Sequence, residues 1–173
     1  MSAQAHEHVA ETRQRLVQAA REAFMKDGYH ANMDGIAARA GVAKQTLYNH
    51  FPGKNELFSE VAGLSSEAIA VTLENGNEEL RAVLLRFAST FRERVLGREG
   101  LALFRALTAE AVRFPELAQA FFAKGSERTA QRLAELLGRG MDDGRLCQDD
   151  PRFAAEMLMS MLGGVEHFRR LCA

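Results

Sequence analysis

The stretch from Met33 to Phe58 reads MDGIAARAGVAKQTLYNHFPGKNELF, and it decides the fold. It predicts two short helices that meet at a sharp angle, with a third helix beginning after Pro52. Asn32 precedes the first helix, where its side-chain oxygen can cap free backbone N–H groups. Gly41 suits the left-handed residue that ends a helix. A short glycine-containing turn between two such helices is typical of the helix-turn-helix arrangement. The first helix has an apolar face made of Met33, Ile36, Ala37 and Ala40.

The second helix of this pair starts at Lys44 and presents mostly polar side chains, while Leu47 faces a small core together with Val42. Asn and Gln amides pair with adenine edges, and Thr offers a hydroxyl or a methyl group to thymine. Tyr, His and Lys hold phosphates, as do the free N–H groups where the next helix begins. A helical hairpin with an ordinary solvated face is the alternative. We predict that DNA is bound by Asn32, Lys44, Gln45, Thr46, Tyr48, Asn49, His50 and Lys54.

The segment from about Thr12 to Phe58 resembles the DNA-binding domain of the TetR family of bacterial transcriptional repressors. Two positions depart from the family pattern. Asn32 stands where Thr or Ser is common and can serve as the same cap. Ala43 stands where Ser is frequent, so we expect one hydroxyl contact or cap to be missing. The resemblance is carried by Ala19, Ala20, Phe24, Gly28, Tyr29, Met33, Ile36, Ala37, Ala40, Gly41, Val42, Thr46, Leu47, Tyr48, Phe51, Pro52, Lys54, Leu57 and Phe58.

The composition favours an all-helical protein with one large and one small domain. The chain has 173 residues, is 47% hydrophobic and contains 3 prolines. Its formal net charge of −1 does not indicate nucleic-acid binding. However, the negative charge of a large acidic domain can offset the positive charge of a small basic one. No apolar run reaches the roughly 20 residues that a membrane helix needs, and the N-terminus has no signal-like apolar core. We therefore expect a cytoplasmic protein without a membrane segment.

The periodicity of apolar residues predicts an all-α fold of about nine helices. Residues 1–52 are expected to form the three-helix DNA-binding domain, and residues 53–173 a helical effector-binding and dimerisation domain. The polar residues 1–10 favour a disordered arm over a metal-binding tail that uses His6 and His8. Ser126 is expected to cap a helix that follows a break at Gly125. The helices are expected over 11–28, 33–40, 44–50, 54–73, 77–96, 101–112, 115–125, 126–142 and 151–171.

The sequence indicates a binding protein rather than an enzyme. Acidic pairs such as Asp149–Asp150 are adjacent near helix ends and suit caps, not opposed catalytic carboxylates. No hydrolase, zinc-protease or phosphate-cradling motif is present, so neither a cofactor nor a metal is expected. Two other classes stay open: a helical adaptor for protein partners, and a redox-sensing regulator that uses Cys147 or Cys172. Neither cysteine has a cationic neighbourhood in the sequence.

The family resemblance implies a homodimer that reads a palindromic operator in double-stranded DNA, with repression more common than activation. The runs RFPELAQAFF (113–122) and DDPRFAAE (149–156) resemble the AefR-like C-terminal domain of this family. Because the bundle is rich in Leu, Phe and Met, we expect a small apolar or amphipathic effector. Its pocket is predicted at Phe87, Phe91, Phe104 and Phe121. TetR-like proteins pair through their last two long helices, which places the predicted interface at Leu133, Leu137, Phe153, Met157, Met161, Gly164 and Phe168.

Overall fold

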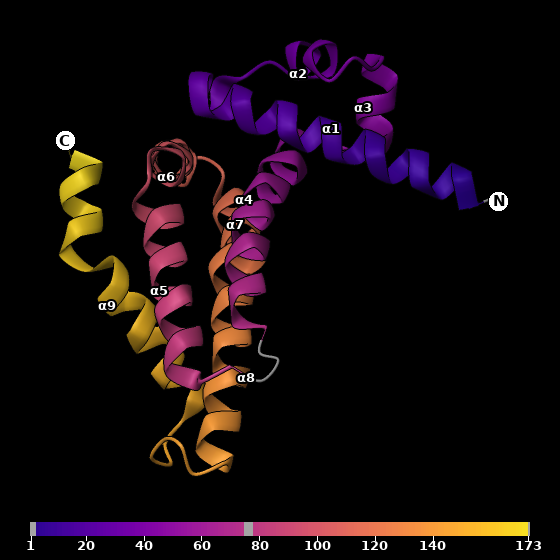
Figure 1. Cartoon of the computed structure of the whole chain (residues 1–173). Helices are drawn as coiled ribbons and strands as arrows, with labels where there is room; N and C mark the ends of the chain where they lie inside the picture. The colour runs from indigo at the N-terminus through magenta and orange to yellow at the C-terminus, as the bar shows by residue number, and fades with distance from the viewer. Residues whose placement is uncertain (1–2, 75–77, 173) are drawn as a thin grey trace. The chain divides into compact units, whose positions relative to one another are not determined.

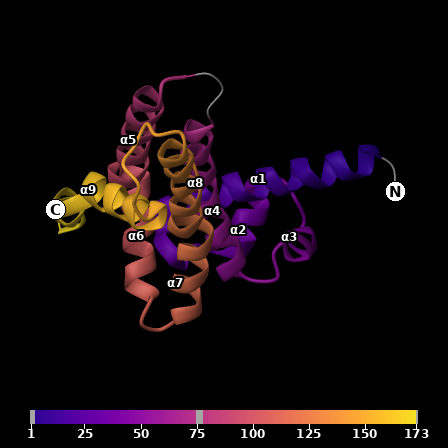
Figure 2. The same ribbon diagram turned by 90° about the horizontal axis from the view of Figure 1, so that it is seen from below.

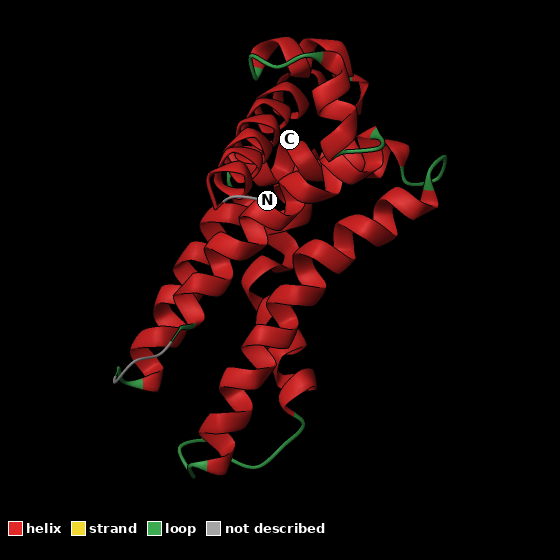
Figure 3. Cartoon of the chain, turned by 90° about the vertical axis from the view of Figure 1, so that its right-hand side faces the viewer, coloured by secondary structure: helices red, strands yellow, loops and turns green. Residues whose placement is uncertain are grey.

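The computed structural model describes residues 3–74 and 78–172, with the side chains from residue 6 onward. These residues form helices and loops without a strand (Figure 3), so the predicted all-α fold is confirmed. The sequence predicts a break between two helices at Asn75 and Gly76 and a helix start near Asn77, and these three residues lie outside the described residues. Within the described part of the chain, no helix combines the length and the apolar character needed to cross a membrane.

The α-helices follow one another with short connections (Figure 1). Two 3-10 turns, Gly28–His30 and Val71–Leu73, follow α1 and α4, and a π-helical segment, Ala123–Glu127, joins α7 to α8. In chain order the helices are α1 (Ala3–Asp27), α2 (Met33–Arg39), α3 (Lys44–His50), α4 (Lys54–Ala70), α5 (Leu80–Leu96), α6 (Arg98–Glu110), α7 (Pro115–Phe122), α8 (Arg128–Asp142) and α9 (Pro151–Cys172).

The first of two compact units contains the chain up to Ala62 together with Ala102–Phe121. Its core is aromatic: Phe24, Phe51 and Phe58 are almost completely buried, with Leu47 and Ile36 beside them. The segment 102–121 adds Leu103, Leu107 and Leu117 to the same core. The sequence-based boundary at residue 52 remains a prediction, but this core shows that α6 and α7 contribute to the packing of α1 to α4.

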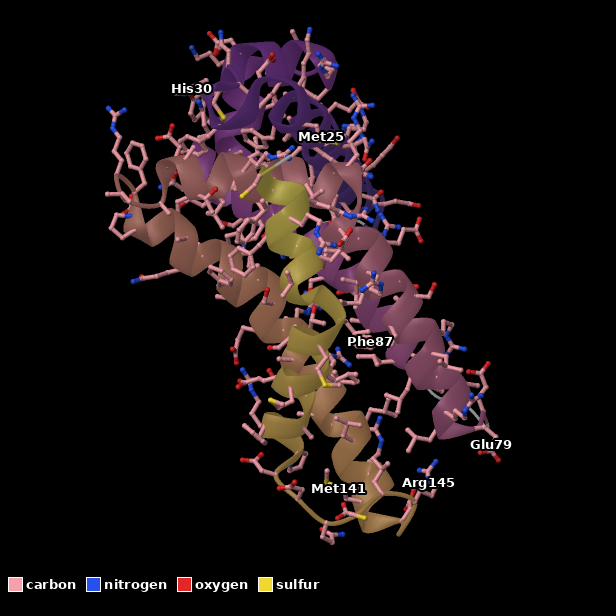
Figure 4. All side chains as sticks on the ribbon, turned by 90° about the vertical axis from the view of Figure 1, so that its left-hand side faces the viewer. Met25, His30, Glu79, Phe87, Met141 and Arg145 are labelled. Carbon is pink, nitrogen blue, oxygen red and sulfur yellow. The ribbon has the colours of Figure 1, made fainter. Side chains whose placement is uncertain are left out.

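The second unit contains Gly63–Leu101 and the chain from Phe122 onward, and α8 and α5 both pack against α9. Phe87 and Met141 are buried in its core (Figure 4). Leu133 and Leu137 were predicted at a dimer interface, but they are buried in this core of their own chain. The reason is that α8 packs against α9, and its apolar face shares a core with residues of α5.

The four phenylalanines predicted to line one effector pocket are divided between the two cores. Phe87 and Phe91 pack in the second unit with ring centroids 5.6 Å apart. Phe104 and Phe121 pack against the core of the first unit, and the Phe121 ring lies 5.7 Å from the Phe58 ring. The apolar pattern marks all four as inward-facing, but it does not show which core each residue joins.

Three local features differ from the sequence expectation. Helix α1 begins at Ala3, so the polar segment expected to be disordered is helical, and its first turns extend past α3 (Figures 1 and 2). A π-helical segment occupies the position of the break expected at Gly125, so the backbone stays helical there. Ser126 lies inside this segment and does not cap α8. Helix α9 bends at Gly164, where φ is 46° and ψ is −151°.

The bend at Gly164 generates a prediction with a built-in control. An added Cβ at Gly164 meets no atom within 4 Å, so the cost of Gly164→Ala comes from its positive φ alone. We expect Gly164→Ala to lower the free energy of unfolding by about 1–2 kcal/mol. Gly163 has equally open surroundings and no positive φ, so Gly163→Ala should instead add about 0.5–1 kcal/mol. Urea unfolding at one protein concentration measures both, and equal effects of the two changes would contradict the bend.

Candidate nucleic-acid interface

The turn between α2 and α3 has the geometry that the sequence predicts for a helix-turn-helix. Asn32 Oδ1 accepts a hydrogen bond from the Asp34 backbone N–H at 3.0 Å, which confirms the predicted cap of α2. Gly41 has a φ of 67° at the corner, a conformation that favours glycine. Ala43 precedes α3 without a side-chain cap, as expected from the missing hydroxyl. Asn32 therefore uses one side-chain oxygen within the protein, which leaves its amide N–H groups for DNA.

Helix α3 is attached to the rest of the molecule by one buried side chain, Leu47. On its other faces Gln45, Tyr48 and Asn49 are exposed, while Thr46 and His50 are half-buried. Gln45 Nε2 donates to Asn49 Oδ1 at 3.0 Å, one helical turn away. The amide of each residue retains further donors or acceptors, so the pair offers both to a base edge.

Lys44 at the first turn of α3 forms an ion pair with Asp34 at the first turn of α2. Its Nζ lies 2.9 Å from Oδ1 and 3.0 Å from Oδ2 of that carboxylate. The hydrogen bond from Lys44 to Asp34, together with the attraction of the carboxylate, raises the pKa of the lysine. The ammonium is therefore charged and exposed, and a DNA phosphate must compete with Asp34 for it.

Lys54 has a different environment from the one predicted for a phosphate ligand. Its Nζ donates to the Tyr29 carbonyl oxygen at 3.0 Å and lies 5.1 Å from the centroid of the Tyr29 ring. Burial lowers the pKa of Lys54, and the nearby Glu110 carboxylate partly offsets this effect. Lys54 therefore holds the start of α4 against the turn Gly28–His30, and a phosphate contact for it stays a prediction.

Sequence reasoning missed two residues that act on this region, Asp34 and Glu110. Asp34 occupies the first turn of a helix, where any carboxylate is favourable. Its position in the sequence therefore did not indicate an ion pair with Lys44. Glu110 is largely buried and lies 3.5 Å from His30 Nε2. Because Glu110 is 80 residues further along the chain, only the folded structure brings it to this turn.

Other groups that the sequence analysis considered do not assemble into a site. Cys147 and Cys172 are exposed free thiols. In residues 3–74 and 78–172, no group of three His, Cys, Asp or Glu side chains is arranged to hold a metal ion. Of the predicted DNA-binding residues, all lie on α3 except Asn32, which precedes α2, and Lys54, which begins α4.

Two descriptions of protein families match separate parts of the chain. Residues 16–61 match the bacterial regulatory proteins of the tetR family. Residues 82–173, which are more than half of the chain, match the C-terminal domain of AefR-like transcriptional repressors.

Individual relatives agree with these matches. The transcriptional activator FasR of Mycolicibacterium smegmatis is 41% identical over 87 residues, which are 44% of this chain and 39% of FasR. An uncharacterised HTH-type regulator of Mycobacterium tuberculosis is 43% identical over 56 residues, which are 32% of this chain and 24% of that protein. The chain therefore spans about a quarter to two fifths of the length of these two relatives.

Solved structures resemble most of the chain. A tetR-family regulator from Mesorhizobium loti superposes with a TM-score of 0.79 at 29% identity, over 95% of this chain and 85% of that one. The flavonoid-responsive regulator FrrA superposes with a TM-score of 0.68 at 32% identity, over 92% and 83% of the two chains.

The Lys44–Asp34 pair leads to a prediction about charge. We expect Asp34→Asn to strengthen binding to every duplex, because the ammonium no longer has to leave a carboxylate. If Lys44 then contacts a phosphate more fully, the slope of log K against log salt becomes more negative by up to about 1. Fluorescence anisotropy over a series of salt concentrations measures both effects. Asp142→Asn makes the same change of net charge on α8 and is the control. An unchanged slope for Asp34→Asn would remove Lys44 from the phosphate contacts.

Proposed function

Because the chain belongs to the TetR family of DNA-binding transcriptional regulators, we propose that it is a homodimeric repressor that binds a palindromic operator and is released by a small ligand. Family membership accounts for DNA binding and for regulation of transcription, and it makes an enzymatic role untenable. The dimer, the sign of regulation, the symmetry of the operator and the ligand are our proposal.

The observation that carries the proposal is the exposed polar face of α3. Gln45 and Asn49 lie one turn apart and have amide groups free to pair with adenine. Tyr48, between them in sequence, is 37% exposed and offers a hydroxyl to a phosphate or a base. A seven-residue helix with one buried residue suits insertion into a major groove, because most of its surface is free for contact.

Phosphate contacts are proposed for the residues that surround this face. Lys44 brings an exposed ammonium to the first turn of α3. His50 lies at the last turn, Asn32 at the start of α2, and Lys54 at the start of α4. Contacts at these places would fix the position of the helix on the duplex without reading its sequence.

The homodimer is supported by the exposed apolar face of α9. Phe153, Met157, Met161 and Phe168 are all exposed in the single chain, with Met161 at 69% and Phe168 at 73%. The opposite face of α9 packs on α5 and α8 through Ala155, which is completely buried. An exposed apolar stripe of this size suits a partner subunit. A two-fold dimer would place two copies of α3 in successive major grooves if they lie about 34–36 Å apart.

The ligand class is supported by composition and by one relative. The core of the second unit is made of Leu, Phe, Val and Met side chains, which suits an apolar or amphipathic effector. The name of the similar regulator FrrA records a response to flavonoids, which supports the same class. Release needs a ligand that favours the non-binding state by only about 1–3 kcal/mol.

Activation is the second candidate, and one relative favours it. FasR is named a transcriptional activator and is 41% identical over the matched segment, whereas the match to the C-terminal part is with AefR-like repressors. The repressor match spans residues 82–173, the part of the chain in which regulation is expected to differ. We therefore propose repression.

Selection of DNA fragments by the purified full chain tests the proposal. We expect enrichment of a palindromic sequence whose half-sites are separated by about one helical turn. Enrichment of a single asymmetric half-site would contradict the dimeric reader. An absence of enrichment would contradict sequence-specific binding. In vitro transcription from a promoter that carries the selected site then separates repression from activation.

Base reading by α3 gives a further prediction. Gln45→Ala and Thr46→Ala should each relax the preference for the selected operator, since one lost base contact costs roughly 1–3 kcal/mol. Anisotropy on the operator and on a scrambled duplex measures the preference. Equal losses on the two duplexes for Gln45→Ala would show that this side chain reads no base.

The dimer interface is tested by Met161→Glu. A glutamate is tolerated at this position in the single chain because Met161 is exposed there, but it would place a charge in a dry contact between subunits. We expect a folded monomer in analytical ultracentrifugation and weak operator binding. Ser89→Glu on the exposed side of α5 is the control and should remain dimeric. A folded Met161→Glu protein that sediments as a dimer would exclude Met161 from the interface.

A further inference from the structure

The segments directly before and after α3 are held by two arginines of α1. We propose that Arg15 and Arg13 are positioning residues: they fix the orientation of α3, and through it the preference of the protein for one DNA sequence, without contacting DNA. This inference rests on the proposed reading of bases by α3. It assigns a role to two residues that lie outside the helix-turn-helix itself.

Arg15 holds the turn that precedes α3. Its Nη2 donates to the Ala40 carbonyl oxygen at 2.5 Å and to the Gly41 carbonyl oxygen at 3.3 Å. The last carbonyls of a helix have no partner within the helix, and a cation is favourable there. One guanidinium nitrogen therefore caps α2 and also holds the peptide after the glycine corner, where φ is 67°. Any rotation of this turn would break one of the two hydrogen bonds.

Arg13 holds the residue that follows α3. Its guanidinium carbon lies 5.0 Å from the centroid of the Phe51 ring, and its Nη2 forms an ion pair with Glu60 of α4. Phe51 comes directly after α3 and is only 2% exposed, so its ring is fixed in the core. The planar guanidinium can stack on the ring and pair with the carboxylate at the same time, which a lysine does less well.

These contacts matter because α3 has few others. It is seven residues long and buries Leu47 alone, and a single buried side chain limits rotation of a short helix about that point only weakly. Hydrogen bonds to base edges require donor–acceptor distances near 3 Å with good alignment. Contacts at both ends of α3 supply the constraint that Leu47 cannot, so the reading side chains reach their bases together.

Both arginines already have partners inside the protein, which distinguishes them from phosphate ligands. Arg15 Nη2 is committed to two carbonyl oxygens, and Arg13 Nη2 is committed to Glu60. A phosphate contact would have to break these bonds or use the remaining nitrogens. The two roles differ in a measurable way: loss of a phosphate contact weakens binding to all sequences and reduces the salt dependence, whereas loss of positioning weakens binding to the operator alone.

The test compares Arg15→Met, Arg15→Lys and Arg13→Met with the unaltered full-length protein. Methionine keeps the apolar length of the side chain but donates no hydrogen bond, and lysine restores a donor for one of the carbonyls. Lys26→Met is the control, since it removes one exposed positive charge from the same helix. Dissociation constants are measured by anisotropy on the operator selected by the protein and on a scrambled duplex, over a series of salt concentrations. Each value is corrected for the active fraction of the preparation.

We expect Arg15→Met and Arg13→Met to reduce the ratio of operator to scrambled affinity roughly tenfold, the effect of about one lost base contact. The salt slope on the scrambled duplex should not change, and Arg15→Lys should recover part of the ratio. Lys26→Met should leave the ratio unchanged. If Arg15→Met does not fold, Arg15→Lys and Arg13→Met still report the ratio.

Four results would overturn the proposal. Equal losses on both duplexes with a salt slope smaller by about one would make Arg15 a phosphate contact. Equal losses with an unchanged slope and a lower melting temperature would make the arginines merely structural. If the unaltered protein showed no preference for any selected operator, both this inference and the proposed reading by α3 would fail. A normal preference in the unaltered protein with unchanged ratios in the variants would refute the positioning role alone.

Discussion

The burial of Leu47 is the interaction on which the DNA-reading part of the molecule depends. A helix of seven residues is not stable by itself in water, because too few hydrogen bonds offset the entropy of its first turn. Helix α3 therefore exists only because Leu47 is inserted into a core with Phe24, Phe51 and Phe58, where its side chain is completely buried. Truncation of a buried leucine typically costs about 2–5 kcal/mol, a large fraction of the stability of a small domain. The polar residues on the other faces remain available for DNA because Leu47 is the one side chain that α3 buries.

The sequence was sufficient to predict the helix-turn-helix because each of its local signals agrees with the others. Asn32 caps α2 as predicted, Gly41 adopts the positive φ that the turn needs, and Leu47 is buried. The bend at Gly164 was not predictable in the same way, since a glycine inside a helical pattern can be tolerated without breaking the helix. The helical start of α1 was also missed, because a polar composition does not exclude a helix that continues from a packed one.

The periodicity of apolar residues identifies the apolar face of a helix, but it does not identify what covers that face. Leu133 and Leu137 repeat at helical spacing on α8, and they fill the core of their own bundle. On α9, by contrast, Ala155 is buried while Phe153 and Met157 are exposed, so the two faces of the helix meet different surroundings. Periodicity shows that a face is apolar, but it does not show whether its own chain or another molecule covers that face. The same limit explains why four phenylalanines with similar sequence signals belong to two cores.

The packing of residues 102–121 in the same unit as the DNA-binding helices supports a short route for regulation. Tyr29 connects the two segments: its ring lies 5.9 Å from the Phe114 ring, and its hydroxyl donates to Asn55 Oδ1. Burial, together with the nearby carboxylates of Glu110, Glu116 and Glu56, raises the pKa of Tyr29, so the hydroxyl keeps its proton and remains a donor at neutral pH. A ligand that shifts the backbone of 102–121 would act directly on these contacts, since that segment carries Phe114 and Glu110. The coupling of about 1–3 kcal/mol that the proposed release needs is comparable to one or two such hydrogen bonds. Under the proposed release, loss of the contacts around Tyr29 would be large enough to supply that coupling.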